Sequence, residues 1–325
     1  MRAARYERLG PAAEVLSVVD IDDPHPAPGE VRVRVHVSGV NPTDWKRRLL
    51  GPAVPPSPGQ IPHQDGSGEI DEIGEGVDPA RLGQRVWVYH AAWNRVGGTA
   101  AEYTCVPADQ AVPLPAGVSH ELGATLGIPY ITAHGALTGD GPIAGATILV
   151  TGGGGAVGHA AIELGTLLGA RVIATASTPQ KAEVARRAGA VEVLDYRSSA
   201  FLDDLRRTAP DGVDRIVEVA LGANLAASLA SLRPHGVIAT YATEAQDPVV
   251  PVRALMTLNA TIRFLLVYNF TADQVAAAVA DISRALALGR IEPLPATVLP
   301  LDQVAAAHEL VEAGTFGRVL LDPRG

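Results

Sequence analysis

The sequence contains very little cysteine and lysine, and each shortage excludes whole classes of site. Cys105 is the only cysteine among 325 residues, so an internal disulfide cannot form, which is typical of a reducing compartment. A single thiol also excludes a four-cysteine structural zinc site. Lysine occurs only at positions 46 and 181. Neither lysine follows a glycine, which excludes a P-loop, and neither completes the Tyr-x-x-x-Lys pair of short-chain dehydrogenases.

Long apolar runs and an excess of positive charge are also missing. No run of about 18 apolar residues occurs, and residues 1–10 carry three arginines but no apolar segment, so we expect neither a membrane span nor a secretory signal. The net charge of −9 disfavours nucleic-acid partners. The nine histidines show no ligand spacing such as His-x-x-x-His, so we expect surface or hydrogen-bonded interior histidines and no metal site. Together these features favour a cytoplasmic protein.

The spacing of apolar residues predicts β structure first and alternating strands and helices afterwards. Residues 31–37 alternate strictly between apolar and polar, as in a half-buried strand, and 69–73 and 85–89 are further short candidates. The proline-rich segment 51–62 predicts an irregular loop. Irregular β structure of this kind suggests a partly closed barrel. From residue 146 onward, candidate strands alternate with candidate helices along the chain. This order predicts a parallel sheet with helices on both faces, and hence an α/β fold.

The second region is expected to contain six strands. They cover residues 147–150, 171–176, 192–196, 213–219, 237–241 and 261–268, with helices over 156–168, 179–188, 199–208, from 224, and over 271–288. The last strand would leave unpaired N–H and C=O groups along an apolar sheet edge, which invites pairing with its twin. We therefore expect a homodimer.

The clearest local motif is a run of glycines that follows the strand Thr147 to Val150. Gly153, Gly155 and Gly158 match G-x-G-x-x-G and open a predicted helix. Glycines let the backbone approach a pyrophosphate, whose charge then rests on N–H groups at the helix N-terminus. We assign this role to Gly153, Gly155, Ala156, Val157 and Gly158. A glycine-rich loop without a ligand is the alternative, and the βαβ setting favours a dinucleotide.

The residues after the second strand of this region indicate which dinucleotide binds. Folds that bind NAD normally place an Asp or Glu about 20 residues after the glycines, bonded to the ribose 2′-hydroxyl. Here no carboxylate occurs between Glu163 and Glu183, and the segment offers Ser177 and Lys181 instead. A hydroxyl and an ammonium group suit a 2′-phosphate, which a carboxylate would repel. We favour NADPH, with Lys181 as an ordinary exposed helix charge being the alternative.

Six motifs distributed over nearly the whole chain carry a family resemblance. They are Gly39-Val-Asn-Pro-Thr-Asp44, Gly68-Glu-Ile-Asp-Glu-Ile-Gly-Glu-Gly76, Gly83-Gln-Arg-Val86, Gly98-Thr-Ala-Ala-Glu-Tyr103, Gly127-Ile-Pro-Tyr-Ile-Thr-Ala133 and the glycine loop. Their order and spacing resemble the zeta-crystallin-like quinone oxidoreductases of the medium-chain dehydrogenase/reductase superfamily. The resemblance implies a GroES-like catalytic domain over residues 1–125, completed by about 292–325. It also implies a Rossmann NADPH-binding domain over 126–291, with the active site in the cleft.

The resemblance further implies a metal-free transfer of hydride from NADPH to a quinone or an α,β-unsaturated carbonyl compound. Asn41 stands where zinc-dependent relatives place a catalytic cysteine, and Gln64 where they place a histidine. The implied catalytic residues are Asn41, Asp44 and Tyr130, with Trp45 and Trp93 in the substrate pocket. The implied cofactor contacts outside the glycine loop are Ser177, Lys181 and Tyr196 at the 2′-phosphate, and Thr132, Tyr241, Thr243, Leu266, Val267 and Tyr268 elsewhere.

Several readings of these residues stay open. The Asn41 amide could stabilise negative charge on the substrate oxygen, or Asn41 could simply be the turn residue before Pro42. Trp45 and Trp93 could pack in the core. His63 precedes Gln64 where relatives usually have glycine, and residues 51–60 lack the aromatic that many relatives carry, so we expect a rebuilt substrate pocket.

The function also has alternatives. An enoyl-thioester or polyketide-tailoring reductase would use the same hydride chemistry on a larger substrate. A non-catalytic NADPH-binding protein, structural or RNA-associated, belongs to a different class, and the acidic net charge weighs against RNA.

Overall fold

The computed structural model describes residues 1–51, 59–242 and 247–325. The chain divides into two compact units, unit 1 (Met1–Ile128 with Pro295–Gly325) and unit 2 (Pro129–Leu294). The divisions that we expected after residues 125 and 291 lie three residues before those at 128 and 294. Within the described ranges, no helix is both long and apolar enough to cross a lipid bilayer.

Unit 1 is built on a mostly antiparallel, seven-stranded sheet with β3 (Glu30–Val40) at its centre. This strand of 11 residues pairs with β4 (Asp65–Ile73), β6 (Tyr103–Pro107) and β15 (Arg318–Asp322) along different parts of its length. Its register against β4 shifts at two places, and such irregularities bend a sheet toward a barrel. The remaining strands are β5 (Arg85–Val88), β7 (Ala111–Pro113), β14 (Ala296–Pro300), and the separate pair β1 (Arg2–Arg5) and β2 (Ser17–Asp20).

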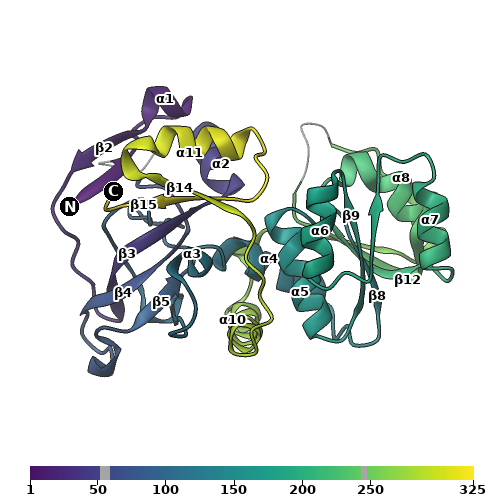
Figure 1. The fold of residues 1–325 in the computed structure, drawn as a ribbon, viewed down its shortest axis with the longest axis horizontal. Helices are drawn as coiled ribbons and strands as arrows, with labels where there is room; N and C mark the ends of the chain where they lie inside the picture. The colour runs from purple at the N-terminus through teal and green to yellow at the C-terminus, as the bar shows by residue number, and fades with distance from the viewer. Residues whose placement is uncertain (52–58, 243–246) are drawn as a thin grey trace. The chain divides into compact units, whose positions relative to one another are not determined.

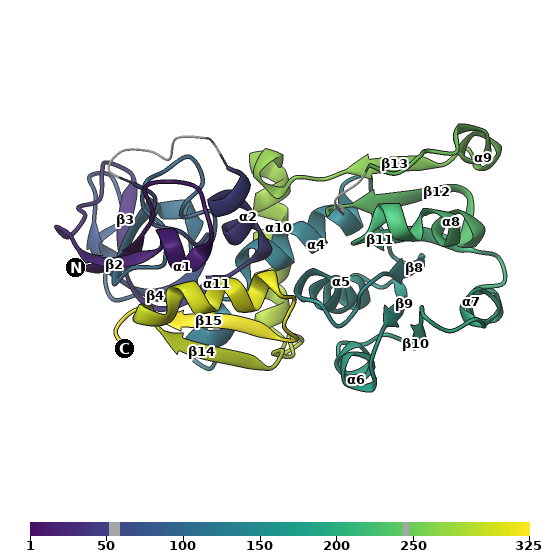
Figure 2. The same ribbon diagram turned by 90° about the horizontal axis from the view of Figure 1, so that it is seen from above.

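The alternation that predicted β3 has the expected effect on burial. Val31 and Val33 are fully buried. Arg34, the next residue of β3, points to the surface and pairs with Glu69 of β4. The two chain ends lie side by side (Figures 1 and 2), where the Arg2 guanidinium donates to the carbonyl oxygen of Gly325 over 3.2 Å. The helices of this unit are α1 (Ala12–Val15), α2 (Pro42–Leu50), α3 (His120–Gly123) and α11 (Val304–Glu312), and α4 (Gly127–Thr138) begins in it.

Unit 2 holds an all-parallel, six-stranded sheet in the order β10-β9-β8-β11-β12-β13. Numbered along the chain, this is the 3-2-1-4-5-6 order of dinucleotide-binding folds, so the expected Rossmann sheet is confirmed. Helices α5 and α6 lie on one side of the sheet, and α7 and α8 on the other (Figure 1). The strands are β8 (Thr147–Val150), β9 (Arg171–Ala176), β10 (Glu192–Asp195), β11 (Val213–Glu218), β12 (Leu232–Thr240) and β13 (Thr261–Phe264). The helices are α5 (Ala156–Leu167), α6 (Pro179–Arg187), α7 (Phe201–Thr208), α8 (Leu221–Ser231), α9 (Val252–Leu258) and α10 (Ala272–Ala287).

The last strand of unit 2 is shorter than the sequence predicted. We expected a strand to Tyr268, but β13 ends at Phe264, and Val267–Asn269 forms a 3₁₀ turn. The N–H of Leu265 still donates to the Thr240 oxygen over 2.9 Å, and β12 ends at that residue. Beyond Thr240, the described residues of this sheet contain no further strand residue opposite β13. Figure 2 shows β13 at the outer edge of the sheet.

Candidate active site

The glycine loop joins the end of β8 to the start of α5, where the strand order of the sheet reverses. Gly152 has a φ of +68°, a left-handed conformation that glycine adopts without strain. A Cβ atom on Gly158 would lie 2.3 Å from the Gly152 oxygen, so only glycine allows this close packing. Gly155 is the N-cap of α5, which places the N–H groups of Ala156 and Val157 in its first turn. Such N–H groups form an anion site.

Lys181 lies directly against this loop. A Cβ atom on Gly154 would come within 2.6 Å of the Lys181 Cβ. Lys181 is in the first turn of α6, where its N–H donates to the hydroxyl of the N-cap Thr178 over 3.2 Å. The capping hydroxyl therefore fixes the lysine at the end of β9, next to Ser177. A cation and hydroxyls beside a glycine loop, with no carboxylate in the segment, suit a 2′-phosphate.

Tyr196 follows the neighbouring strand β10 and is 48% exposed. Because β9 and β10 are parallel, the residues that follow them lie at the same edge of the sheet. Arg197 pairs there with Asp195 over 3.1 Å, a contact between two exposed side chains. Three of the predicted phosphate contacts, Ser177, Lys181 and Tyr196, thus follow adjacent strands.

The residues predicted to line the nicotinamide follow β12 and β13. A cavity at the ends of these strands is lined by Leu221, Thr240, Tyr241, Ala242, Asp247, Pro248, Phe264 and Leu265. Leu266 is exposed and directly precedes the 3₁₀ turn. Val267, the first residue of the turn, is buried, and Tyr268 follows it. Thr132 is buried on α4. Thr243 lies outside the described residues.

A buried carboxylate that the sequence did not single out anchors the end of β11. Glu218 Oε1 accepts hydrogen bonds from the Thr151 hydroxyl (3.0 Å), the Ala220 N–H (2.7 Å) and the Asn224 amide (2.8 Å). Thr151 begins the glycine loop, so Glu218 ties that loop to the adjacent strand. The carboxylate holds the backbone of the nucleotide site in place.

In unit 1, Asn41 is part of a buried polar cluster. It is the N-cap of α2, and its backbone N–H donates to Asp44 Oδ2 over 2.7 Å. Its side-chain nitrogen donates to Asp65 Oδ2 over 2.7 Å, and its side-chain oxygen accepts from Arg318 over 3.0 Å. The backbone N–H of Ile128, in the first turn of α4, also reaches the Asp65 carboxylate over 2.9 Å. Both ends of the Asn41 amide therefore have partners within residues 1–51, 59–242 and 247–325, and the bond to Asp65 uses one of its two N–H groups.

The two carboxyl groups of this cluster have unusual acidities. Burial raises the pKa of Asp65 to about 7, although the Ile128 N–H and the Arg318 charge act to lower it. Burial also raises the pKa of Asp44 well above its ordinary value, opposed by the Asn41 N–H and reinforced by the nearby Asp65. The Arg318 guanidinium thus acts on both buried carboxyl groups, Arg47 also lowers the pKa of Asp44, and Asp65 titrates near neutral pH.

Tyr130 lies in a second buried hydrogen-bond group, in unit 2. Its hydroxyl donates to Glu163 Oε2 over 2.6 Å, and Glu163 Oε1 accepts from the Glu292 N–H. His159 Nε2 lies 3.2 Å from Glu163 Oε1 and 2.8 Å from the Glu292 oxygen. Burial lowers the pKa of His159, but the Glu163 carboxylate and the Glu292 oxygen more than offset this, so its pKa is raised. The Tyr130 hydroxyl is accordingly oriented by a carboxylate.

Trp45 and Trp93 are both half-buried, and a cation lies over each ring. The Lys46 ammonium is 5.7 Å from the centre of the Trp45 ring, and the Arg47 guanidinium is 5.3 Å from that of Trp93. Because Arg47 is a residue of α2, its contact with Trp93 shows that the 90–96 segment lies beside α2. The fully buried tryptophan of the chain is Trp87.

His63, which departs from the family pattern, is directed into the interior of unit 1. It is fully buried with a φ of +75°, and its Nδ1 lies 2.8 Å from the Ser38 hydroxyl. Its Nε2 lies 3.0 Å from Nε2 of His308. Burial lowers the pKa of His63 to about 3, and burial together with His63 lowers that of His308 far below its ordinary value. Burial thus favours the neutral form of both imidazoles, and Gln64, the residue after His63, is also buried.

Sequence reasoning missed the residues that position the predicted ones. Asp65 starts β4 as a single carboxylate before a run of small residues, and Arg318 is the charge that opens the last apolar strand. Glu163 and Glu218 stand inside or at the end of apolar segments. A carboxylate or guanidinium within a buried segment needs a partner, which is the only signal that the sequence offers for them.

We expect the Asp65→Asn variant to alter how stability depends on pH. Between its ordinary pKa of 3.8 and its folded pKa of about 7, Asp65 keeps a proton that the unfolded chain has released. The native protein therefore loses stability as pH rises through this range, by up to about 1.4 kcal/mol per pH unit. Asparagine cannot ionise, so urea unfolding of the variant should lack the Asp65 part of this slope and keep only the part due to the raised pKa of Asp44. Parallel curves for the two proteins would show that Asp65 is ionised throughout.

Comparisons with known proteins agree with this geometry. A family model described as "Zinc-binding dehydrogenase" matches residues 156–284, and one described as "Alcohol dehydrogenase GroES-like domain" matches residues 27–116. The crystal structure of an NAD-dependent alcohol dehydrogenase is similar, with a TM-score of 0.89 at 28% identity and 99% of both chains covered.

Quinone oxidoreductases are similar along the full length of the chain. That of Rattus norvegicus is 30% identical over 330 residues, with 99% of this chain and 97% of the rat protein covered. That of Escherichia coli, crystallised with NADPH, has a TM-score of 0.84 at 26% identity, with 99% of this chain and 100% of that chain covered. With the Rossmann strand order, the glycine loop and the GroES-like match in place, the chain belongs to the zeta-crystallin-like quinone oxidoreductase family of medium-chain dehydrogenases/reductases.

Proposed function

We propose that this protein is an NADPH-dependent reductase that delivers a hydride to a quinone or an α,β-unsaturated carbonyl compound without a catalytic metal. The observation that carries the proposal is the position of Lys181 against the glycine loop, in a segment without a carboxylate. The E. coli relative crystallised with NADPH supports the same cofactor.

The residues of unit 2 fit a dinucleotide phosphate. The N–H groups of the first turn of α5 suit the pyrophosphate, and the packing at Gly158 leaves no room for a side chain there. Ser177, Lys181 and Tyr196 would hold the 2′-phosphate, and Tyr241 with residues 266–268 the nicotinamide end. When bound, NADPH supplies the hydride, and the protein contributes orientation and electrostatics.

The polar cluster of unit 1 supplies a hydrogen-bond donor for the acceptor molecule. Asn41 donates one of its two amide N–H groups to Asp65, and Arg318 holds the amide oxygen. Asp44 accepts from the Asn41 backbone N–H and so fixes the position of the residue. We assign the second amide N–H of Asn41 to the substrate oxygen, where negative charge develops during the reaction. Asp44 thus acts by positioning Asn41. The substrate roles of Trp45 and Trp93 in unit 1, and of Tyr130, whose hydroxyl Glu163 orients in unit 2, stay predictions.

The proposal excludes catalytic zinc because of the donor types at the relevant positions. Asn41 and Gln64 carry neutral amides where zinc-dependent relatives carry a thiolate and an imidazole, and amides are poor zinc ligands. The proposal also places the enzyme in the cytoplasm, in keeping with its single cysteine.

Replacing Lys181 by Glu should raise KM for NADPH by about tenfold or more and leave KM for NADH nearly unchanged. The new carboxylate would repel the 2′-phosphate, and a loss of about 1.4 kcal/mol corresponds to a factor of ten. Arg186→Glu, which reverses a charge at the other end of the same helix, is the matched control. Equal KM values for NADPH and NADH in the unaltered enzyme would contradict the assignment.

The acceptor should be conjugated. Reduction of an isolated ketone requires strong polarisation of its carbonyl, which zinc or a Tyr-Lys pair normally supplies. With only hydrogen bonds available, we expect turnover of a quinone and an unsaturated ketone, and little of the matching saturated ketone. NADPH oxidation is measured with each, before and after dialysis against a strong chelator, with equal rates expected. Comparable turnover of the saturated ketone would reveal a missed activating group.

We also propose that the protein is a homodimer that pairs through β13. This strand is the edge of the unit 2 sheet, and its Phe264 is 73% exposed, with Leu266 just beyond it 52% exposed. An exposed apolar edge strand has unpaired backbone groups that a second copy can satisfy by antiparallel pairing.

The Phe264→Glu variant should shift the protein toward the monomer of 33.7 kDa. A carboxylate on the edge would have to be desolvated next to its symmetry mate, which disfavours pairing. Light scattering at several concentrations measures the effect, and Leu82→Glu, at an exposed leucine of unit 1, serves as control. A monomer in the unaltered protein would rule out the dimer.

A further inference from the structure

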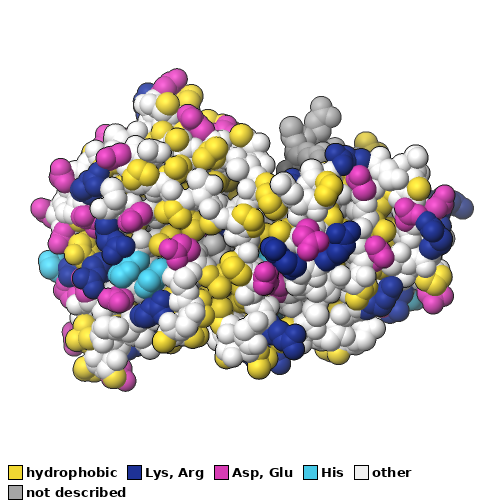
Figure 3. Space-filling model, in the orientation of Figure 1, with side chains coloured by type: hydrophobic (Ala, Val, Ile, Leu, Met, Phe, Trp, Pro, Cys, Tyr) yellow, Lys and Arg dark blue, Asp and Glu magenta, His cyan; other side chains and the backbone are white. Residues whose placement is uncertain are grey.

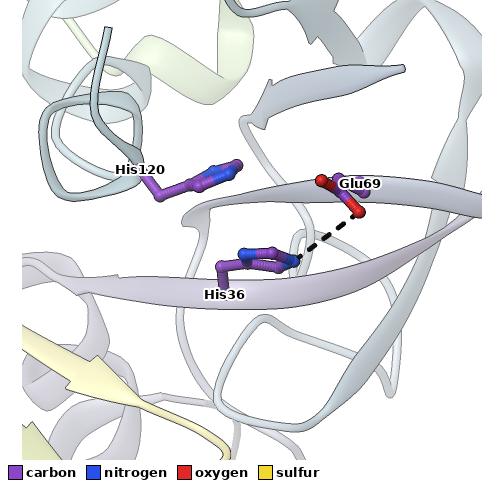
Figure 4. A group of neighbouring side chains, drawn as sticks. All are labelled: His36, Glu69 and His120. Carbon is purple, nitrogen blue, oxygen red and sulfur yellow. Dashed lines mark ion pairs between the residues drawn. The ribbon is translucent and has the colours of Figure 1, made fainter. Parts of the chain in front are cut away.

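Two histidines and one glutamate from three separate segments meet on unit 1 (Figure 4). His36 is on β3, Glu69 is on β4 and His120 is the first residue of α3. Each offers a ligand atom, and these atoms all lie within 4.8 Å of one another. Figure 3 shows histidines among basic and acidic side chains on the visible face of this unit. We propose that His36, Glu69 and His120 bind a divalent transition-metal ion of the zinc class.

The distances are close to those of a bound ion. His36 Nε2 lies 4.0 Å from Glu69 Oε2, and the two imidazole centres are 4.4 Å apart with their planes inclined by 38°. A tetrahedral zinc ion with bonds of about 2.0–2.1 Å holds its ligand atoms about 3.3 Å apart. Side-chain rotations that move the ligand atoms by about an ångström therefore close the site around an ion, without movement of the strands.

The hydrogen bonds of His120 prepare it as a ligand. The Ser67 hydroxyl donates its proton to the His120 backbone oxygen over 2.7 Å. Because that proton is used, the Ser67 oxygen must accept from the Nδ1–H of the His120 ring, which lies 2.9 Å away. This arrangement leaves the lone pair on Nε2, the atom that a metal would take. A second residue that fixes the tautomer of a histidine ligand is a regular feature of metal sites.

His36 also has an available ring nitrogen. Its Nε2 is buried and lacks a hydrogen-bond partner within residues 1–51, 59–242 and 247–325. A buried polar atom of this kind requires an explanation, and a bound metal ion is one of the usual ones. The side chain as a whole is 18% exposed and that of Glu69 is 32% exposed, so an ion in solution can reach both.

The ligand types select the ion. Two imidazole nitrogens and one carboxylate oxygen form the His₂Glu set that zinc accepts, with water in the fourth position. Calcium and magnesium prefer oxygen ligands, so they should bind poorly here.

Three cations face the site and limit its affinity. Arg34 of β3 pairs with Glu69 Oε2 over 2.8 Å and competes with an ion for that carboxylate. The Nε of Arg85, on β5, lies 3.4 Å from His120 Nε2. The pKa of His36 is lowered, mainly by burial and next by the charge of Arg324. The guanidinium of Arg85 is held by the carbonyl oxygens of Pro115, Ala116 and Val118. An ion replaces the long Arg85 contact and leaves those three bonds intact.

The bound ion would tie β3, β4 and α3 together and stabilise unit 1. None of its three ligands belongs to the Asn41 and Asp65 cluster, so the site is separate from the proposed hydride transfer. Binding of an ion to the folded state alone raises the unfolding temperature.

The test uses chelator-treated protein titrated with zinc, by calorimetry and by the shift in unfolding temperature. We expect saturable binding of one ion per chain, and affinity lowered at least about tenfold in His36→Ala, His120→Ala and Glu69→Gln. His25→Ala is the matched control, because His25 is an exposed histidine that also pairs with a glutamate, Glu72, over 3.0 Å. The unfolding temperature without zinc and the quinone reductase rate establish that each variant is folded.

Two further variants separate this site from adventitious binding by surface histidines. Ser67→Ala keeps all three ligands, and it should weaken zinc binding by about 10–100-fold. Arg34→Gln should tighten it by roughly threefold to tenfold, because a competing positive charge is removed. X-ray absorption at the zinc edge should show two imidazole ligands.

Several results would overturn the proposal. These are no saturable zinc binding by the unaltered protein, equal loss of binding in His25→Ala and His120→Ala, or fewer than two imidazoles in the absorption spectrum. An unchanged reductase rate with zinc bound keeps the proposed function intact in every case, so the two proposals fail separately.

Discussion

The carboxylate of Asp65 is the point where three distant segments of unit 1 are joined. It accepts hydrogen bonds from Asn41 at the end of β3 and from the N–H of Ile128 at the start of α4. Arg318, at the start of β15, binds the other side of the same asparagine. A buried charge without partners costs several kcal/mol, so these contacts must form together. The orientation of Asn41 and the beginning of α4 both follow from this requirement.

Unit 2 uses a similar device. Glu218 at the end of β11 gathers the Thr151 hydroxyl, a backbone N–H and the Asn224 amide, and it thereby holds the start of the glycine loop. The loop itself carries no side chains that could fix it, because glycines are needed for close approach to a phosphate. Rigidity therefore has to come from neighbouring side chains. In both units a buried carboxylate positions the residues that we assign to binding.

The histidines illustrate how environment decides the role of one residue type. Burial lowers the pKa of both His63 and His308, whereas for buried His159 the Glu163 carboxylate more than offsets burial and raises the pKa. His36 and His120 are half-buried beside Glu69, where we propose that they bind a metal ion. The expectation that the histidines lie at the surface or satisfied in the interior describes the first three. The proximity of the last two to each other and to Glu69 depends on the fold.

The sequence by itself determined the features that rest on local spacing. Apolar/polar alternation placed β3, and short apolar runs that alternate with helices placed the strands of the Rossmann sheet. The glycine motif with its following segment predicted the nucleotide loop and Lys181 beside it. These predictions needed only residues that are near one another in the chain, because periodicity and turn chemistry are local. The roles of Asn41, Asp44, Tyr130 and the tryptophans stay predictions.

Only the tertiary structure decided which distant side chains meet. The Arg318, Asn41 and Asp65 cluster, the His63 and His308 pair, and the group of His36, Glu69 and His120 all join residues from separate strands and helices. Their pairing is set by the need to satisfy buried charge and polarity, which no single segment of the sequence can express.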